Sequence, residues 1–262
     1  MSEERVHLMS SKRTVEDFEV LRGPLESGRQ RPSALAGVLV LCVFLQALLF
    51  SLEYFVAGDV TAYPYKDEIL KVHFWITAGL IVLSLIYAIP AVYKRSGKVQ
   101  YLLSILVAQN LFSVSLFICA LFFIGKKGEG SSVAPESLLN FTYITLLIGL
   151  LVFIATFVRF AILLRNGHYR KGSKKDELRT RFETKSYIPA AVLGGIGLVF
   201  VIQYIARTSA ITDINIMVVI AIGILLFYVM LFILPEQLVI LYCKFRFKSF
   251  NFNEQGKLYN EK

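Results

Sequence analysis

Apolar residues in this chain gather in long runs separated by short polar stretches. A helix needs about 20 mostly apolar residues to cross a bilayer, because the hydrocarbon core is about 30 Å thick and a helix rises about 1.5 Å per residue. Six runs meet this length. They cover residues 33–57, 72–93, 101–124, 139–164, 188–207 and 213–242.

The runs are continuous and lack the alternating polarity of transmembrane β-strands. Lipid cannot satisfy exposed backbone groups, so a spanning segment has to be a helix or part of a closed barrel. The pattern therefore predicts an all-α, polytopic integral membrane protein with a bundle of six transmembrane helices over residues 33–242. An N-terminal segment (1–32) and a basic and aromatic tail (243–262) flank the bundle.

Composition agrees with this reading. Of the 262 residues, 56% are hydrophobic and 18% are charged, whereas soluble domains average about 45–50% and about 25%. These values exclude a disordered chain, a collagen-like chain and a disulfide scaffold, and they argue against a soluble enzyme. The connections between runs are too short to fold as domains. Any chemistry is therefore expected within the helices or through a partner.

The distribution of positive charge predicts the orientation. Of the 28 Lys and Arg residues, 22 lie in segment 1–32, the second and fourth connections and the tail, five lie in the other connections, and Arg159 lies within a span. Cytoplasmic loops carry the excess of Lys and Arg, so both termini are expected in the cytoplasm, with the chain in the plasma membrane. The net charge of +9 then faces anionic lipid headgroups, and no nucleic acid partner is expected.

Two ionisable residues, Arg159 and Glu236, lie at similar depth within predicted spans, near the cytoplasmic side. Such residues are costly in a bilayer and often functional. They could form an intramembrane ion pair or gate, or each could extend to the headgroups. Pro235 leaves two possibilities for its span, a kink or an end near Leu234, and Pro90 is expected to bend or end the second span.

A second polar cluster is expected on the outer side, where Glu53 ends the first span and His73 begins the second. A histidine near carboxylates can titrate near neutral pH or bind a metal. With a single histidine on this side, no metal site is predicted. The alternative is an interfacial polar cluster in which Tyr54 and Trp75 are aromatic belt residues.

Other polar and small residues predict helix contacts. Amides at mid-depth, Gln46 and Gln109-Asn110, are expected to bond across helices or to line a substrate path. A possible helix-contact face in the fifth run consists of Ala191, Gly194, Gly195 and Gly197, whose small side chains allow close backbone approach.

Both flanking segments are expected at the inner membrane surface. The Thr14-to-Asp17 spacing predicts a helix start, and Val15, Phe18 and Leu21 would then share one apolar face. The tail alternates basic and aromatic residues, which suits the headgroup boundary and predicts a membrane anchor.

No catalytic motif accompanies these features. The chain lacks a P-loop, HExxH and GxSxG, and Cys42, Cys119 and Cys243 lie far apart, so neither an enzyme nor a cofactor is predicted. Two function classes are left. One is a non-catalytic membrane protein that acts through a protein partner in the bilayer, as a subunit, regulator or immunity (self-protection) protein. This first class is the function predicted. The alternative is a transporter or permease subunit for a small solute or peptide, energised by a separate ATPase or an ion gradient.

Overall fold

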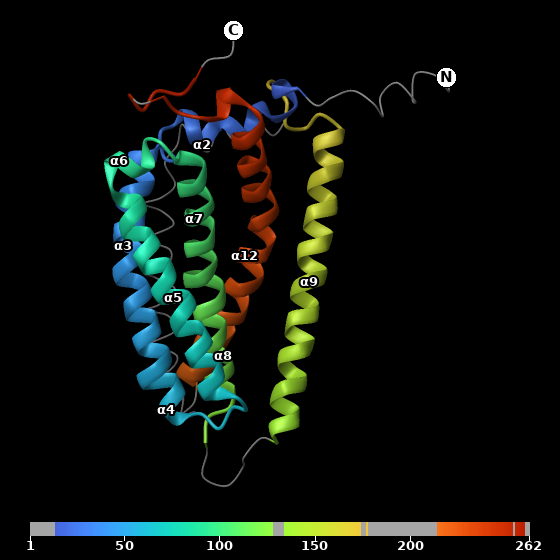
Figure 1. Ribbon diagram of the computed structural model, residues 1–262. Coiled ribbons are helices and arrows are strands. Elements are labelled where there is room, and N and C mark those ends of the chain that lie inside the picture. The colour runs from blue at the N-terminus through green and yellow to red at the C-terminus, as the bar shows by residue number, and fades with distance from the viewer. Residues whose placement is uncertain (1–13, 128–133, 174–176, 178–213, 254, 260–262) are drawn as a thin grey trace, which may run out of the picture.

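The computed structural model describes residues 14–127, 134–173, 177, 214–253 and 255–259 (Figure 1). Within these residues, the regular structure is helical apart from isolated β-bridges. Five helices of the described part are long and apolar enough to cross a membrane. They are Pro32–Val60, Lys66–Ala88, Gly97–Ile124, Pro135–Arg165 and Ile216–Arg246. The expectation of an all-helical protein with several membrane-length helices is confirmed.

Five of the six predicted runs overlap these helices. The largest difference is in the second run, which was expected from residue 72, whereas the helix begins at Lys66. Charged residues at its start do not prevent the helix, because acidic side chains in a first turn favour the positive end of the helix dipole. The predicted run 188–207 lies outside the described residues.

The first and third long helices each contain one π-helical segment. In the first, α3 (Pro32–Leu52) passes into η2 (Glu53–Ala57) and α4 (Gly58–Val60). In the third, α7 (Gly97–Gln109) passes into η3 (Asn110–Ser115) and α8 (Leu116–Ile124). The N–H of Gly58 donates to the carbonyl of Glu53, five residues back. π-Helical segments are rare and frequently occur at functional sites, so these two mark where a site is to be sought.

The two helix prolines have different effects. α5 (Lys66–Ala88) ends just before Pro90, and Ile89 is extended ahead of the short α6 (Pro90–Tyr93), as predicted. In contrast, α12 (Ile214–Arg246) continues through Pro235. The alternative in which this span ends near Leu234 is therefore wrong. The ring of Pro235 is fully buried, so packing stabilises the helix where a hydrogen bond is lost.

Glycine residues allow α12 to pack closely against α8 and α9 (Pro135–Arg165). A Cβ at Gly223 would lie 2.7 Å from the carbonyl oxygen of Leu116 in α8. One turn further along, the rings of Phe117 and Phe227 stack with centroids 4.5 Å apart. The same ring of Phe227 also lies against Gly149 of α9. Small residues allow this close contact between helices.

The N-terminal segment packs on protein. It forms a 3-10 helix, η1 (Val15–Arg22), followed by α2 (Gly23–Glu26). The predicted cap is present, since the N–H of Thr14 donates to the Asp17 carboxylate at 3.1 Å. Phe18 is fully buried against the rings of Tyr242 and Phe247 at the end of α12. The apolar face expected along the membrane surface therefore covers the bundle instead.

The tail also folds back onto the bundle. Phe250, in the 3-10 turn η4 (Lys248–Phe250), is fully buried. The side-chain amide of Asn251 donates to the carbonyls of Lys244 and Phe247, at 2.7 and 2.8 Å, and so caps α12. Phe245 remains 58% exposed. The anchor expected from the basic and aromatic alternation is thus in part an internal packing element, because the tail has the bundle end to pack against.

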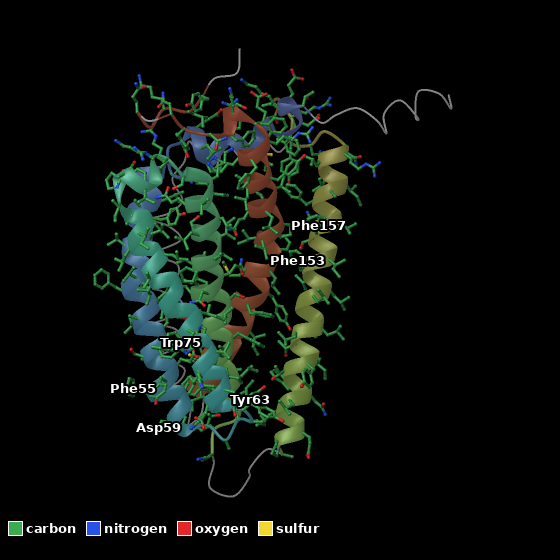
Figure 2. The ribbon with its side chains drawn as sticks, viewed as in Figure 1. Phe55, Asp59, Tyr63, Trp75, Phe153 and Phe157 are labelled. Atoms are coloured by element: carbon green, nitrogen blue, oxygen red, sulfur yellow. The ribbon has the colours of Figure 1, made fainter. Side chains whose placement is uncertain are left out.

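The segment 15–26 and the tail lie at one end of the bundle, which is called the terminal end below (Figure 1). At the opposite end, the loops after the first and third long helices bond to each other. The N–H of Ala62 donates to the carbonyl of Gly125 at 2.7 Å, and that of Lys127 donates to Val60 at 3.0 Å. Tyr63 bonds to Thr142 of α9 at this end (Figure 2), and burial raises the pKa of its phenol.

Replacing Gly223 with Ala should destabilise the bundle. The added Cβ would meet the Leu116 carbonyl and the Cβ of Ala120, and overpacking typically costs about 1–3 kcal/mol. The measurement is the thermal unfolding midpoint of the protein in detergent. Gly79→Ala is the matched control, because a Cβ at Gly79 of α5 meets nothing within 4 Å. Equal midpoints for the two variants would contradict the described crossing of α12 and α8.

Candidate functional site

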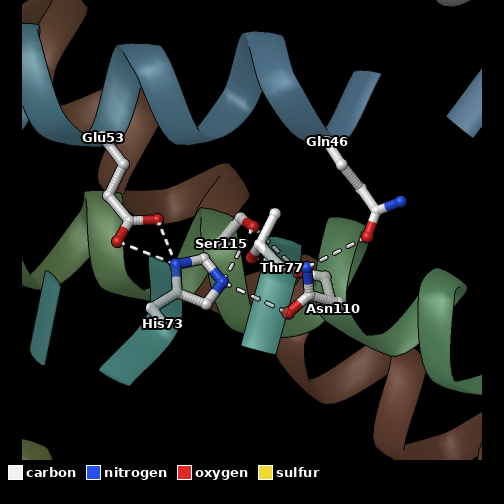
Figure 3. A network of polar contacts seen from close by, with 6 residues as sticks. All are labelled: Gln46, Glu53, His73, Thr77, Asn110 and Ser115. Atoms are coloured by element: carbon white, nitrogen blue, oxygen red, sulfur yellow. Dashed lines mark hydrogen bonds and ion pairs between the residues drawn. The ribbon is translucent and has the colours of Figure 1, made fainter. Parts of the chain in front are cut away.

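Glu53 and His73 form a buried pair near the opposite end of the bundle (Figure 3). The imidazole Nδ1 of His73 lies 2.9 Å from Oε1 and 2.8 Å from Oε2 of Glu53. Glu53 is 0% and His73 is 2% exposed. The hydrogen bond joins Nδ1 to Oε1, and Oε2 is a buried oxygen with no hydrogen-bond partner among the described residues. A carboxylate so poorly solvated depends on its histidine.

The network extends from the other side of the imidazole. His73 Nε2 lies 3.2 Å from Asn110 Oδ1 and 3.4 Å from the Ser115 hydroxyl. The amide nitrogen of Asn110 donates to Thr77 Oγ1 at 3.1 Å and to Gln46 Oε1 at 3.5 Å. All these side chains are at most 3% exposed. The site is therefore a continuous polar network enclosed by apolar surroundings.

Local helix geometry brings these residues to one place. His73 and Thr77 are four apart on α5 and so share a face. Asn110 begins the π-helical segment η3 and Ser115 ends it, and the Ser115 hydroxyl donates to the Asn110 carbonyl at 2.9 Å. Glu53 begins η2. Both π-helical segments of the described chain thus contribute side chains to the network, and the network joins three of the long helices.

The orientation of Asn110 decides where the protons lie. Because its nitrogen donates to Thr77 and Gln46, its oxygen faces His73 and has to accept a hydrogen bond from Nε2. The contact between Nδ1 and Glu53 needs a proton as well. The pair therefore holds either an imidazolium beside a carboxylate or an imidazole beside a carboxylic acid, and both states are neutral overall. Loss of that proton would leave a buried negative charge.

The aromatic neighbours lie outside the network. Tyr54 is 51% and Trp75 is 67% exposed on the surface of the bundle, and Trp75 is seen there in Figure 2. Asp59 is likewise exposed. Tyr54 and Trp75 thus face outward, as belt residues would, while Glu53 and His73 face inward. The alternative of an interfacial polar cluster stays a prediction.

Arg159 and Glu236 line one pocket of about 210 Å³ between α9 and α12. Arg159 is exposed and Glu236 is partly buried. The ion pairs within the described part of the chain do not join these two residues to each other. The gate hypothesis for this pair stays a prediction.

The helix-contact face of Ala191, Gly194, Gly195 and Gly197 lies outside the described residues. Cys42, Cys119 and Cys243 are buried free thiols. Over the described ranges, no group of three or more His, Cys, Asp or Glu side chains could hold a metal ion.

Comparisons of the chain with models of protein families, with curated proteins and with solved structures found no match. The geometry of the site and the physical chemistry of its groups are thus the basis for assigning a function.

Sequence reasoning placed Glu53 near His73 but missed the members that complete the network. Asn110 and Gln46 were expected to bond across helices, without a named partner. Thr77 and Ser115 gave no separate signal because hydroxyl residues are common in membrane helices. The four-residue step from His73 to Thr77 was the available clue, since it puts both side chains on one helix face.

Replacing His73 with Gln should lower the stability of the protein by about 3–5 kcal/mol, because the buried carboxylate loses its partner. The double variant with Glu53→Gln should recover a large part of this loss, because the charge is then gone as well. Unfolding of the purified protein in mixed micelles with increasing denaturing detergent measures both. Glu68→Gln, an exposed carboxylate at the same end, is the control without effect. If the loss of stability in the double variant equals the sum of the losses in the two single variants, the residues do not form a pair.

Proposed function

We propose that this protein is a proton-coupled transporter of a small solute, with Glu53 and His73 as its proton-binding site. The observation that carries the proposal is the burial of this pair at 0% and 2% exposure, with Nδ1 of His73 2.9 Å from Oε1 of Glu53. Of the two classes expected from the sequence, it favours the transporter energised by an ion gradient. A bundle that only had to be stable could use well-packed apolar residues at such positions at similar or lower free energy.

The protonation state affects several helices at once. With the proton bound, His73 is hydrogen-bonded both to Glu53 on the first long helix and to Asn110 on the third. Without it, one of these hydrogen bonds is lost and a negative charge is left in an apolar interior. The contacts between the three helices therefore differ between the two states, which is what coupling of a proton to a conformational change requires.

An aromatic groove of about 500 Å³ lies beside the site. Its lining supports a small, largely apolar molecule as the transported solute. Phe50, Phe55 and Phe74 line it, with Asp67 and Lys71 at its charged edge. The Phe50 ring lies between groove and network, with its centroid 5.8 Å from that of His73. Movement of this one side chain would bring a bound solute next to the imidazole.

The proposal includes six spans, both termini in the cytoplasm and the plasma membrane as location. α9 ends and α12 ends at the same, terminal end of the bundle (Figure 1). α12 begins at the opposite end, which supports the sixth span expected from the sequence over residues 188–207. Lys and Arg gather in the segments of the terminal end, which supports a cytoplasmic position for it.

The test uses the full-length protein in sealed vesicles that contain a pH-sensitive dye. Under an imposed proton gradient, small solutes of differing charge and polarity are added one at a time. A transported solute should change the internal pH in wild-type vesicles. With Glu53→Gln or His73→Gln the rate should fall at least about tenfold, because the proton-binding group is gone. Glu68→Gln should keep the wild-type rate.

Retention of the wild-type rate by both site variants would refute Glu53 and His73 as the proton site. The other class, a non-catalytic protein acting through a partner in the bilayer, stays a prediction. It would replace the transporter if no solute changes the internal pH and a single protein co-purifies with the chain in fixed ratio from mildly solubilised membranes.

A further inference from the structure

A pocket of about 570 Å³ lies at the terminal end, far from the proton site. Three parts of the chain that are distant in sequence line it: the start of α3, the turn between α6 and α7, and the end of α12 with the tail that folds back after it. This volume is within the range of about 300–1,000 Å³ of small-molecule sites. It exists only because the tail returns over the bundle.

Positive charge gathers in the described part of the pocket. Among the described residues of its lining, Lys94, Arg95, Lys98 and Lys244 are cationic and none is acidic. Within the described part of the chain, the ion pairs involve none of the four. Like charges gathered around a hollow repel one another, and an anion bound between them would relieve this repulsion.

Among the four cationic side chains, Lys244 distinguishes this pocket from an ordinary solvated surface patch, because it is buried. It is 3% exposed, on the last turn of α12. Its ammonium donates to the carbonyl of Phe250 at 3.2 Å and lies 5.0 Å from the ring centroid of Tyr101. An ammonium has three N–H donors, and the described contacts give it one conventional acceptor. A buried cation in the wall of a cavity, held by neutral groups alone, is a built feature of an anion site.

Two long helices also begin at this pocket. Pro32 and Ser33, at the start of α3, and Gly97 and Lys98, at the start of α7, line it. The first N–H groups of a helix have no acceptor within the helix, and the helix dipole places partial positive charge there. Phosphate groups bind readily at such ends. The helix starts thus add to the field of the four side chains.

We propose that this pocket binds the phosphate-bearing headgroup of an anionic phospholipid. The chemistry recognised is an organic phosphate, matched by lysine and arginine donors. Its position at the end of the membrane-length helices, with the exposed ring of Phe245 at its edge, favours a lipid over a soluble phosphate ester. The cavity shares no residue with the proton site, so either proposal can fail without the other.

Titration of the full-length protein in neutral detergent tests this inference. The probe is dihexanoyl phosphatidylglycerol, compared with the zwitterionic dihexanoyl phosphatidylcholine and with glycerol 3-phosphate. Binding is followed by calorimetry and by the rise in the unfolding midpoint, which a ligand specific for the folded state produces. The anionic lipid should bind saturably, at one molecule per chain, and at least about tenfold more tightly than either comparison ligand.

Variants connect the binding to the pocket. Arg95→Gln and Lys98→Gln, at partly or fully exposed positions that tolerate change, should each weaken binding of the anionic lipid by about tenfold or more. Lys244→Met should do the same where it folds. Lys248→Gln is the matched control, because Lys248 is an exposed cation of the same tail outside the lining.

Three outcomes overturn the proposal. Absence of saturable binding would show that the cations only repel one another around an empty hollow. Wild-type affinity in Arg95→Gln and Lys98→Gln would place the lipid elsewhere. Equal or tighter binding of glycerol 3-phosphate would assign the pocket to a soluble organic phosphate and remove the lipid.

Discussion

A polar group inside an apolar bundle can bond only to another polar group of the same bundle, and the arrangement of the first three long helices follows from this constraint. Glu53 finds its partner in His73, and His73 finds its second partner in Asn110, at 2.9 and 3.2 Å. Each contact crosses between helices, so the helices cannot slide or rotate independently without stranding a charge. Apolar packing alone would leave several orientations of similar free energy, because lipid tails are as apolar as the helix surfaces.

The two ends of the bundle are closed by different means. At the end near Glu53 and His73, backbone hydrogen bonds between short loops, such as Ala62 to Gly125, hold the helices together. At the terminal end, a cluster of aromatic and aliphatic side chains from the first and last described segments forms a cap. The first closure is compact, whereas the second encloses a basic cavity. The molecule thus has a buried polar network near one end and a charged recess at the other.

Much of the helix arrangement could be predicted from sequence because the membrane imposes a length and a polarity on each segment. Pro90 ended its helix as local chemistry requires. Pro235 did not, since its ring is buried in contacts that local chemistry does not reveal. The same distinction holds in the site. Glu53 and His73 could be paired from the short loop between their helices, but Asn110 could be added only once the third helix had a known rotation. The π-helical segments, which shift the register of side chains, leave no mark in the hydrophobic pattern.

The burial of Phe18 against Tyr242 and Phe247 has a consequence for biogenesis. These contacts join residues more than two hundred positions apart in the chain. While the ribosome is still making the intervening helices, Phe18 and its apolar neighbours have no surface on which to fold. Contacts of such long sequence separation form late and leave apolar surface exposed in the meantime. The cap at the terminal end is therefore completed only after α12 and the tail have been made, and a chain that stops before α12 leaves Phe18 without its two aromatic partners.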